Sequence, residues 1–243
     1  MVGIFDVHCH ILPEVDDGSR SLEETLEMLR MEYRDGVRTV IFTPHFRREM
    51  FETDMRKITA AFLKTREAAA KTMSDLELYL GCEYHVNMEM VSALKNGQRP
   101  AMAGSRYVLS EFSGDAPFSY MRERIRELRS NRFHPIIAHT ERCFCLRKDV
   151  SRIEELVDAG AYIQINAGSI LGEEGFGCKQ FCKKLMRMDL IHFIGSDSHR
   201  TTERVPNIGK CAAYLKKKMG EDYARQLLEY NPRRIIEEGR ENR

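Results

Sequence analysis

The sequence has no apolar run close to the roughly 20 residues of a membrane-spanning helix, and it has almost no net charge. Its 38 Lys and Arg residues are spread along the chain and leave a net charge of +1. This distribution lacks the concentrated basic surface of a nucleic-acid-binding protein. We therefore expect no membrane insertion and no nucleic-acid partner, and any anionic ligand must be bound by local groups.

The start of the chain and its cysteines bear on location. Residues 1–8 carry neither the basic segment nor the small-residue cleavage site of a signal peptide. We expect them to lead into the first strand and the protein to be cytoplasmic. The seven cysteines are odd in number, which predicts reduced thiols. Cys143-x-Cys145 and Cys178-x3-Cys182 lack the C-x2-C spacing of structural zinc sites, so we interpret them as packed thiols.

Strand and helix patterns alternate along the chain. Apolar stretches rich in β-branched residues recur, and the segments between them have helical periodicity, as expected of repeated βα units. The seven predicted strands are 4–7, 39–43, 76–80, 107–110, 135–138, 162–166 and 192–195. The predicted helices are 22–33, 55–70, 120–130, 153–159, 179–188 and the tail beyond 208, with an extra short helix and loop within 88–100.

This alternation predicts one α/β domain spanning 1–243, because barrels of strands and helices reach this length as single units. An open doubly wound sheet would normally present a Gly-rich phosphate loop after a strand, and the sequence has none. We therefore predict a distorted seven-stranded (β/α)7 barrel resembling a TIM barrel.

Metal-binding side chains recur where the predicted strands end. In barrels of this kind the carboxyl ends of the strands face a common mouth, where active sites lie. Residues two apart on a strand point the same way, so His8 with His10, and Asp197 with His199, can share a face. The candidate ligands, including a turn residue that can fold back over the mouth, are His8, His10, Asp17, His45, Glu83, Glu111, His139, Asp197 and His199.

Such a set calls for metal. Four carboxylates converging without partners would repel one another, and divalent cations remove that cost. Nine ligands exceed the needs of one ion, so we predict two or three cations with coordination numbers of about four to six. Mixed oxygen and nitrogen ligands suit manganese, iron and zinc alike. Any single histidine at a strand end has a structural alternative, and we interpret His85, His134 and His192 in that way.

The strand ends also carry recognisable motifs: Asp6-Val7-His8-Cys9-His10, Asp16-Asp17-Gly18, Thr43-Pro44-His45, Gly81-Cys82-Glu83, His139-Thr140-Glu141-Arg142 and Ser196-Asp197-Ser198-His199. Through these motifs, over nearly the whole chain, the sequence resembles the PHP (polymerase and histidinol phosphatase) superfamily. Within it, residues 15–19, the 139–142 motif and Arg204 are similar to the manganese-dependent tyrosine phosphatases encoded with bacterial capsule and exopolysaccharide genes.

The resemblance implies a PHP-type barrel and specific roles. It implies three metal positions, held by His8, His10, Glu83 and Asp197, by Glu83, Glu111 and His139, and by Asp17, His45 and His199. It also implies that Arg142 and Arg204 hold the phosphate and that the metal is manganese. The implied reaction is hydrolysis of a phosphate monoester by water that the cations activate. The implied partner is a phosphotyrosine protein, the tail of a bacterial tyrosine autokinase that controls polysaccharide export.

Alternatives remain open at this point. The ligand set also suits a small-molecule phosphatase such as histidinol phosphatase, or a nuclease-like phosphodiesterase. An amidohydrolase shares the His-x-His pattern, but Glu83 and Glu111 at strand ends do not fit it. A metal-binding regulatory domain without activity is the alternative outside enzymes. A thiol-based tyrosine phosphatase is excluded, because no cysteine stands six residues before an arginine.

Overall fold

Parallel strands form the frame of the protein, as a computed structural model describing residues 3–242 shows. One sheet has the order β1 (Ile4–Cys9), β2 (Val37–Phe42), β4 (Glu77–Leu80). The other has the order β3 (His45–Phe46), β5 (Glu83–His85), β6 (Tyr107–Glu111), β7 (His134–Ile137), β8 (Tyr162–Asn166), β9 (Phe193–Gly195). All strand pairs in the two sheets are parallel, which confirms the predicted α/β class.

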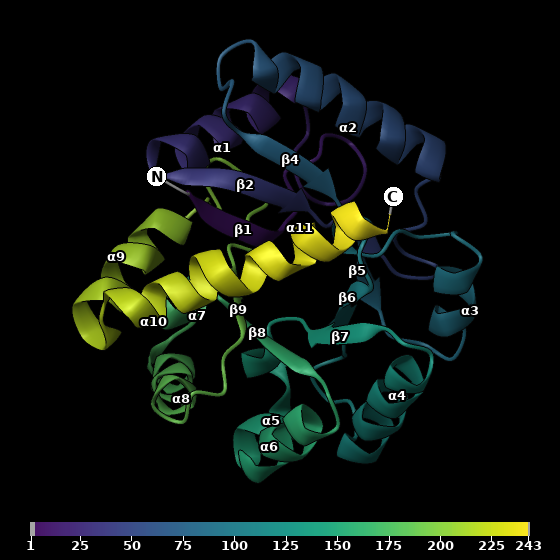
Figure 1. Ribbon diagram of the computed structural model, residues 1–243, viewed down its shortest axis with the longest axis vertical. Helices are drawn as coiled ribbons and strands as arrows, with labels where there is room; N and C mark the ends of the chain where they lie inside the picture. Colours follow the sequence, from purple (N-terminus) through teal and green to yellow (C-terminus); the bar gives the residue numbers. More distant parts are fainter. Residues whose placement is uncertain (1–2, 243) are drawn as a thin grey trace.

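Helices surround the strands (Figure 1). The α-helices are α1 (Leu22–Arg34), α2 (Met55–Ala70), α3 (Met90–Lys95), α4 (Phe118–Ser130), α5 (Phe144–Lys148), α6 (Ser151–Asp158), α7 (Ala167–Leu171), α8 (Phe176–Arg187), α9 (Ile208–Met219), α10 (Glu221–Arg225) and α11 (Asn231–Glu241). Short turns of other helix types are η1 (Met102–Gly104), η2 (Thr140–Arg142) and η3 (Gln226–Tyr230). The short helices α5 and α7 were not predicted from the sequence.

The described residues contain nine strands where the sequence predicted seven, because two of the predicted strands are followed by separate short strands. Thr43 and Pro44 separate β2 from β3, and Gly81 and Cys82 separate β4 from β5. A proline has no N–H for the ladder, so a strand is interrupted there. The Pro44 carbonyl instead accepts a hydrogen bond from Glu83 N at 3.1 Å, which aligns β3 with β5.

The sheet curls until its first and last strands are neighbours. Cys9 at the end of β1 forms a parallel bridge with Ser198, which follows β9. Two backbone hydrogen bonds reinforce the contact, from His10 N to Ser198 O at 2.8 Å and from Asp197 N to His8 O at 2.7 Å. The chain is therefore an α/β protein whose parallel strands follow a curved, TIM-like course.

Apolar packing closes the amino end of this curved sheet. An inner cluster contains Phe5, Val7 and Leu109 from the strands and Ile235 and Ile236 from α11. A larger cluster lies between the strands and the outer helices. Helix α11 crosses the molecule in Figure 1 and covers the ends at which the strands begin. The carboxyl ends of the strands are thereby left as the place for polar side chains.

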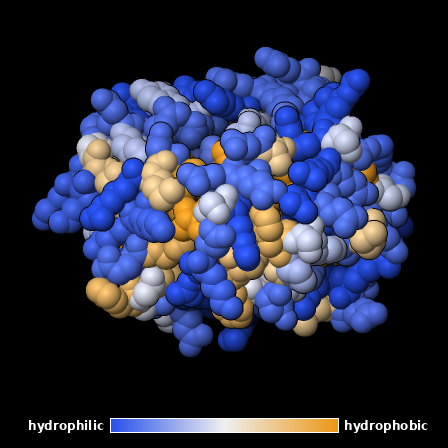
Figure 2. Space-filling model, turned by 90° about the horizontal axis from the view of Figure 1, so that it is seen from below, coloured by the Kyte–Doolittle hydropathy of each residue, from blue (hydrophilic) through white to orange (hydrophobic). Residues whose placement is uncertain are grey.

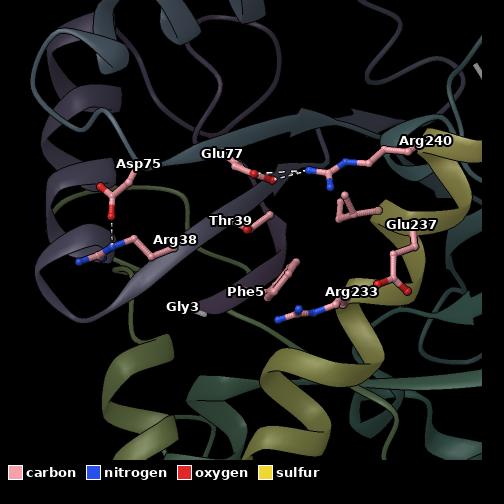
Figure 3. Close-up of a pocket in the computed structure, with 10 residues that line it drawn as sticks. Gly3, Phe5, Arg38, Thr39, Asp75, Glu77, Arg233, Glu237 and Arg240 are labelled. Carbon is pink, nitrogen blue, oxygen red and sulfur yellow. Dashed lines mark hydrogen bonds and ion pairs between the residues drawn. The ribbon is translucent and has the colours of Figure 1, made fainter. Parts of the chain in front are cut away.

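The surface over the amino end is polar and paired. A pocket of about 270 Å³ there is lined by charged groups of both signs (Figure 3). Arg240 pairs with Glu77 at 3.1 Å and Arg38 pairs with Asp75 at 3.0 Å. Elsewhere the face seen in Figure 2 is mainly hydrophilic with small apolar areas. Among the described residues, no helix is both long and apolar enough to cross a membrane.

Helix α1 buries an acid against β1. Ser21 caps the helix by accepting a hydrogen bond from Glu24 N at 3.1 Å. The buried face of the helix includes Glu32, whose two carboxylate oxygens have no hydrogen-bond partner. Burial, reinforced by the nearby charges of Asp6 and Asp35, raises the pKa of Glu32 well above its usual range. Burial therefore favours the protonated, uncharged form of Glu32 in the folded protein.

We predict that Glu32→Gln stabilises the protein at neutral pH. The folded chain keeps a proton on Glu32 that the unfolded chain releases above the ordinary glutamate pKa. The contribution of Glu32 to the free energy of unfolding is therefore most favourable below the ordinary glutamate pKa, and it falls as the pH rises toward the raised pKa of the folded state. Thermal melts between pH 4 and 8 should show a higher Tm for Glu32→Gln at the neutral end, on the order of a few degrees. Glu27→Gln, an exposed change on the same helix, is the control, and equal neutral-pH shifts would contradict the prediction.

Candidate active site

Seven of the nine predicted ligands lie at the carboxyl ends of strands or in the segments that follow them, and His45 and Glu83 begin the short strands β3 and β5 that follow β2 and β4. The β1 end is shaped by close backbone approaches. The pairing of β1 with β2 shifts register between Asp6 and Cys9, a local irregularity of the kind that re-aims side chains. Gly18 packs so closely that a side chain would collide with the His10 carbonyl, which explains the glycine of the Asp-Asp-Gly turn. A side chain on Gly195 would likewise collide with His8.

The first group joins β1 to the segment after β9. The Nε2 atoms of His8 and His10 lie 3.3 Å apart. Glu83 Oε2 is 3.3 Å from His8 Nε2 and 3.2 Å from His10 Nε2. Asp197 Oδ1 is 3.6 and 3.5 Å from the same two nitrogens. These four residues are the set that the resemblance implied for one metal position.

The second group lies on the other side of Glu83. Glu83 Oε1 is 2.9 Å from His139 Nε2, and Glu83 Oε2 is 2.9 Å from His45 Nδ1. Glu111 Oε1 is 3.8 Å from His139 Nε2. The ligand atoms of His45, Glu83 and Glu111 also lie within 4.8 Å of one another. The structure thus adds His45 to the set implied for the second position.

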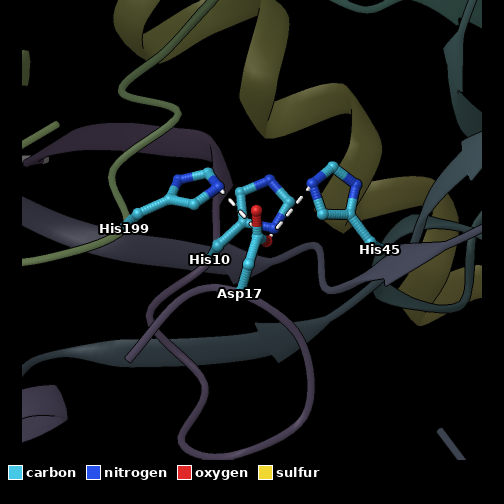
Figure 4. Close-up of side chains that lie close together, drawn as sticks. All are labelled: His10, Asp17, His45 and His199. Atoms are coloured by element: carbon cyan, nitrogen blue, oxygen red, sulfur yellow. Dashed lines mark ion pairs between the residues drawn. The ribbon is translucent and has the colours of Figure 1, made fainter. Parts of the chain in front are cut away.

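The third group surrounds Asp17, as Figure 4 shows. Asp17 Oδ1 is 3.6 Å from His45 Nε2 and 3.5 Å from His199 Nε2. The His10 ring lies between these two imidazoles, with its centroid 4.2 Å from each. His10 therefore belongs to this group as well as to the first. The three groups share members and form one continuous cluster.

The electrostatics of the cluster favour bound cations. Burial raises the pKa of Glu83, but the neighbouring imidazoles of His8 and His45 outweigh it and hold the pKa well below its usual range. Burial also raises the pKa of Asp197, and His8, Arg204 and Arg142 outweigh it. Glu83 Oε2 is buried without a hydrogen bond although three imidazole nitrogens lie within 3.3 Å. A carboxylate oxygen facing several imidazole nitrogens fits the donor set of a divalent cation.

Further side chains orient the imidazoles. His10 Nδ1 bonds to Asp16 Oδ2 at 2.8 Å, and the same oxygen accepts from His45 N at 3.0 Å. His8 Nδ1 bonds to Gln164 Oε1 at 3.1 Å. In metal sites such contacts fix the tautomer and direct the other ring nitrogen at the ion. Asp16 is thus positioned to orient His10 and to hold the backbone at His45.

Gln164 and Asn166 were missed in the sequence. Gln164 Oε1 also accepts from His139 N at 2.7 Å, and Asn166 Nδ2 donates to Asp197 Oδ2 at 2.7 Å. Both belong to β8, the strand position that carries no predicted ligand. Their signal was present in the sequence, because two polar residues alternate with isoleucines at the end of an otherwise apolar strand. The side-chain amides of these two β8 residues therefore position His8, His139 and Asp197.

Three residues of the site have backbone conformations that favour glycine. His139 has φ 29°, Asp197 has φ 54° and Arg204 has φ 49°. Non-glycine residues in this region carry strain of about 1–3 kcal/mol and cluster at functional sites. The surrounding hydrogen bonds to His139 and Asp197 hold these conformations in place.

Both predicted arginines reach the cluster. Arg142 Nη1 lies 2.9 Å and Arg204 Nη2 lies 2.5 Å from Asp197 Oδ2. Arg204 Nη1 is 2.8 Å from His199 Nε2. Arg142 also pairs with Glu174, at 2.5 Å from Nη2 to Oε1. Two partly exposed guanidinium groups therefore stand at the edge of the cluster, where a phosphate can be bound.

The other histidines lie outside the cluster, as the sequence analysis expected. His85 Nε2 contacts Ser113 Oγ at 3.1 Å, and His134 Nδ1 contacts Arg129 Nη1 at 2.6 Å. His192 Nδ1 accepts from Ile163 N at 3.1 Å. None of the three belongs to a possible metal-ligand group found within residues 3–242.

Comparisons with known proteins agree with this site and fold. The family described as "Capsular polysaccharide synthesis, CpsB/CapC" matches residues 4–237. Tyrosine-protein phosphatase CpsB of Streptococcus pneumoniae is 36% identical over 238 residues, covering 96% of this chain and 98% of that protein. Tyrosine-protein phosphatase YwqE of Bacillus subtilis is 31% identical over 226 residues, covering 93% and 89%.

Solved structures give the same result. A structure described as YwqE from Bacillus subtilis and CpsB from Streptococcus pneumoniae, "unique metal-dependent tyrosine phosphatases", superposes with a TM-score of 0.90. It has 30% identity and covers 97% of this chain and 95% of that chain. The phosphotriesterase homology protein of Escherichia coli has 13% identity and a TM-score of 0.62, covers 97% and 99%, and supports the fold alone.

Fold and site together define the class of the protein: an α/β protein with a cluster of possible metal ligands at the carboxyl ends of its parallel strands. More specifically, the chain belongs to the CpsB/CapC family. The curated relatives named above are tyrosine-protein phosphatases.

We predict that Asp16→Asn weakens metal binding. The change removes the carboxylate that faces His10 Nδ1 and leaves the ligand itself in place. Losing such a supporting contact typically costs about 10–100-fold in metal affinity. Calorimetric titration of the chelator-stripped protein with Mn²⁺ measures this. Asp75→Asn, which removes an exposed carboxylate at the opposite end, is the control. Unchanged affinity in Asp16→Asn would reduce Asp16 to a turn residue.

Proposed function

We propose that this chain is a metal-dependent tyrosine-protein phosphatase that hydrolyses phosphotyrosine in a partner protein. The observation that carries the proposal is the convergence of nine imidazole and carboxylate groups with two guanidinium groups at one end of the sheet. Membership in the CpsB/CapC family, with tyrosine phosphatases among its curated members, supports the choice of substrate.

The proposed cofactors are two or three divalent cations, with manganese preferred and iron or zinc as alternatives. His8, His10, Glu83 and Asp197 would hold one cation. Glu83, Glu111 and His139, with His45 adjacent, would hold a second, and Asp17, His45 and His199 a third. When bound, these cations supply Lewis-acid stabilisation of the phosphoryl oxygens and activation of water.

The protein's own groups position the reactants. Asp16 and Gln164 orient His10 and His8, and Glu83 lies between two ligand groups. Arg142 and Arg204 are proposed to bind phosphoryl oxygens, where guanidinium groups stabilise the charge of the transition state. A phenolate is a good leaving group, so an aryl ester needs little help from a general acid. Burial raises the pKa of the Cys9, Cys82 and Cys211 thiols, which does not suit a thiol nucleophile.

We predict that Arg142→Ala and Arg204→Ala each lower kcat by about 10²–10³-fold, as for other lost donors to transition-state charge. Metal content should stay at the wild-type level, because neither arginine is a ligand. Steady-state kinetics on p-nitrophenyl phosphate and metal analysis of the same samples measure both effects. Arg122→Ala, on α4 and paired with Glu155, is the control. Metal loss in either test variant would assign that arginine a structural role instead.

The substrate class is tested by comparing kcat/KM for a phosphotyrosine peptide, a phosphoserine peptide and histidinol phosphate at one Mn²⁺ concentration. We predict that the phosphotyrosine peptide is preferred and that prior removal of metal with EDTA abolishes its turnover. If histidinol phosphate were preferred by about tenfold, or about 1.4 kcal/mol of transition-state binding, the small-molecule phosphatase alternative would replace the proposal.

The biological setting is also proposed. The partner would be the tyrosine-phosphorylated tail of a bacterial autokinase that controls polysaccharide export, in keeping with the capsule description of the family. A cytoplasmic location suits the seven free cysteines.

We further propose that the fold is a single PHP-type domain over 1–243 with seven strand positions around a barrel. The contact between β1 and the end of β9 supports that topology, with β2 and β3, and β4 and β5, sharing positions.

A further inference from the structure

Two exposed phenylalanines lie close in the chain to Arg142 and to its ion-pair partner Glu174, and Arg142 is one of the two arginines proposed to bind phosphate. Phe144 is 58% exposed and Phe176 is 77% exposed, unusual values for aromatic side chains of this size. Phe144 begins α5 two residues after Arg142, and Phe176 begins α8 two residues after Glu174. Since Arg142 and Glu174 form an ion pair, the two helix starts are brought to the same side of the cluster.

A side chain of α5 reaches the start of α8. A methyl group on Gly177 would lie 3.6 Å from Arg147 Nη2, so the Arg147 guanidinium group lies beside the first turn of α8. Phe144 N donates to Gly114 O at 2.8 Å, which fixes where α5 begins. A hollow of about 410 Å³ is lined by Phe144, Arg147 and Lys148.

Two basic residues of α5 line the hollow. Arg147 and Lys148 are exposed, and no salt bridge to either is found within residues 3–242. Unpaired cations beside exposed aromatic rings fit a segment that has both acidic and apolar side chains. The position next to Arg142 places this surface where the residues flanking a bound phosphotyrosine lie. Arg142 and Phe144 are two residues apart, so their Cα atoms are at most about 7 Å from each other. If Arg142 binds the phosphate, the peptide residues next to the phosphotyrosine can therefore reach this surface.

We propose that Phe144, Phe176, Arg147 and Lys148 form a subsite for the polypeptide that flanks phosphotyrosine in the substrate. An apolar flanking side chain packs against the two rings, and acidic side chains pair with the two cations. The proposal rests on the proposed phosphatase function and deepens it by giving the substrate class: an acidic phosphotyrosine peptide with an apolar neighbour. A small aryl phosphate has no flanking chain and makes none of these contacts.

The first test measures the ratio of kcat/KM for an acidic, leucine-containing phosphotyrosine peptide to kcat/KM for p-nitrophenyl phosphate. In the double variant Phe144→Ala/Phe176→Ala the ratio should fall by about tenfold, as expected when two anchoring contacts are lost. Leu63→Ala, an exposed apolar residue on α2, is the matched control and should leave the ratio unchanged. Both phenylalanines are exposed, so the Tm of the double variant should match that of the wild type. An unchanged ratio overturns the proposal.

A second test isolates the charges. Arg147→Glu/Lys148→Glu should weaken kcat/KM for the acidic peptide and have a smaller effect on a peptide whose acidic residues are replaced by lysine. The loss for the acidic peptide should also become smaller at high salt, because exposed ion pairs are screened. An equal loss for both peptides would overturn the role of the two cations.

Peptide binding tests the subsite apart from turnover. The Kd of the fluorescently labelled peptide, measured by anisotropy, should rise about tenfold in the phenylalanine double variant. If the wild type hydrolysed no phosphotyrosine substrate but this Kd change were found, the proposed reaction would fail and the subsite would stand. Equal Kd values would overturn the subsite. So would sedimentation showing a dimer that the double variant dissociates, because a second copy would then cover the surface.

Discussion

The carboxylate of Glu83 is the group on which the rest of the site depends. It is fully buried and lies within 3.3 Å of nitrogens from His8, His10, His45 and His139. A buried anion is expensive unless cations surround it, and here the surrounding imidazoles hold its pKa well below the usual range. The strands that supply these imidazoles must end at one place, so the geometry of the sheet and the chemistry of the site constrain each other.

The fold meets this constraint by separating its two ends. Helix α11 fills the amino end with Ile235 and Ile236, so the inner apolar cluster needs no polar group there. At the other end, the interruptions after β2 and β4 produce the short strands β3 and β5, which begin at His45 and Glu83. These two strands pair with each other in register, His45 opposite Glu83. The breaks that raise the strand number are thus the features that bring two ligands together.

Sequence reasoning went furthest where a local rule sufficed. Residues at the ends of parallel strands meet at one edge of the sheet, and this rule, with Asp17 added from the turn after β1, grouped the nine predicted ligands. Gln164 and Asn166 left a polar pattern at the end of β8, but their roles were missed because these depend on His8 and Asp197, which lie far away in the chain. The five-residue helices α5 and α7 are too short for a periodic signal. The subsite at Phe144 follows from one of these unpredicted helices, so its position became visible only in three dimensions.

Asp197 connects the two functions of the site. Its Oδ1 faces the nitrogens of His8 and His10, while its Oδ2 accepts from Asn166, Arg142 and Arg204. One carboxylate therefore takes part in the ligand cluster through one oxygen and orients both guanidinium groups through the other. Asp197 has a left-handed backbone conformation, and its N–H donates to the His8 carbonyl. In the proposed reaction, arginines held in place before a phosphate binds would need less reorganisation as the phosphoryl charge develops, which is the condition for effective electrostatic stabilisation.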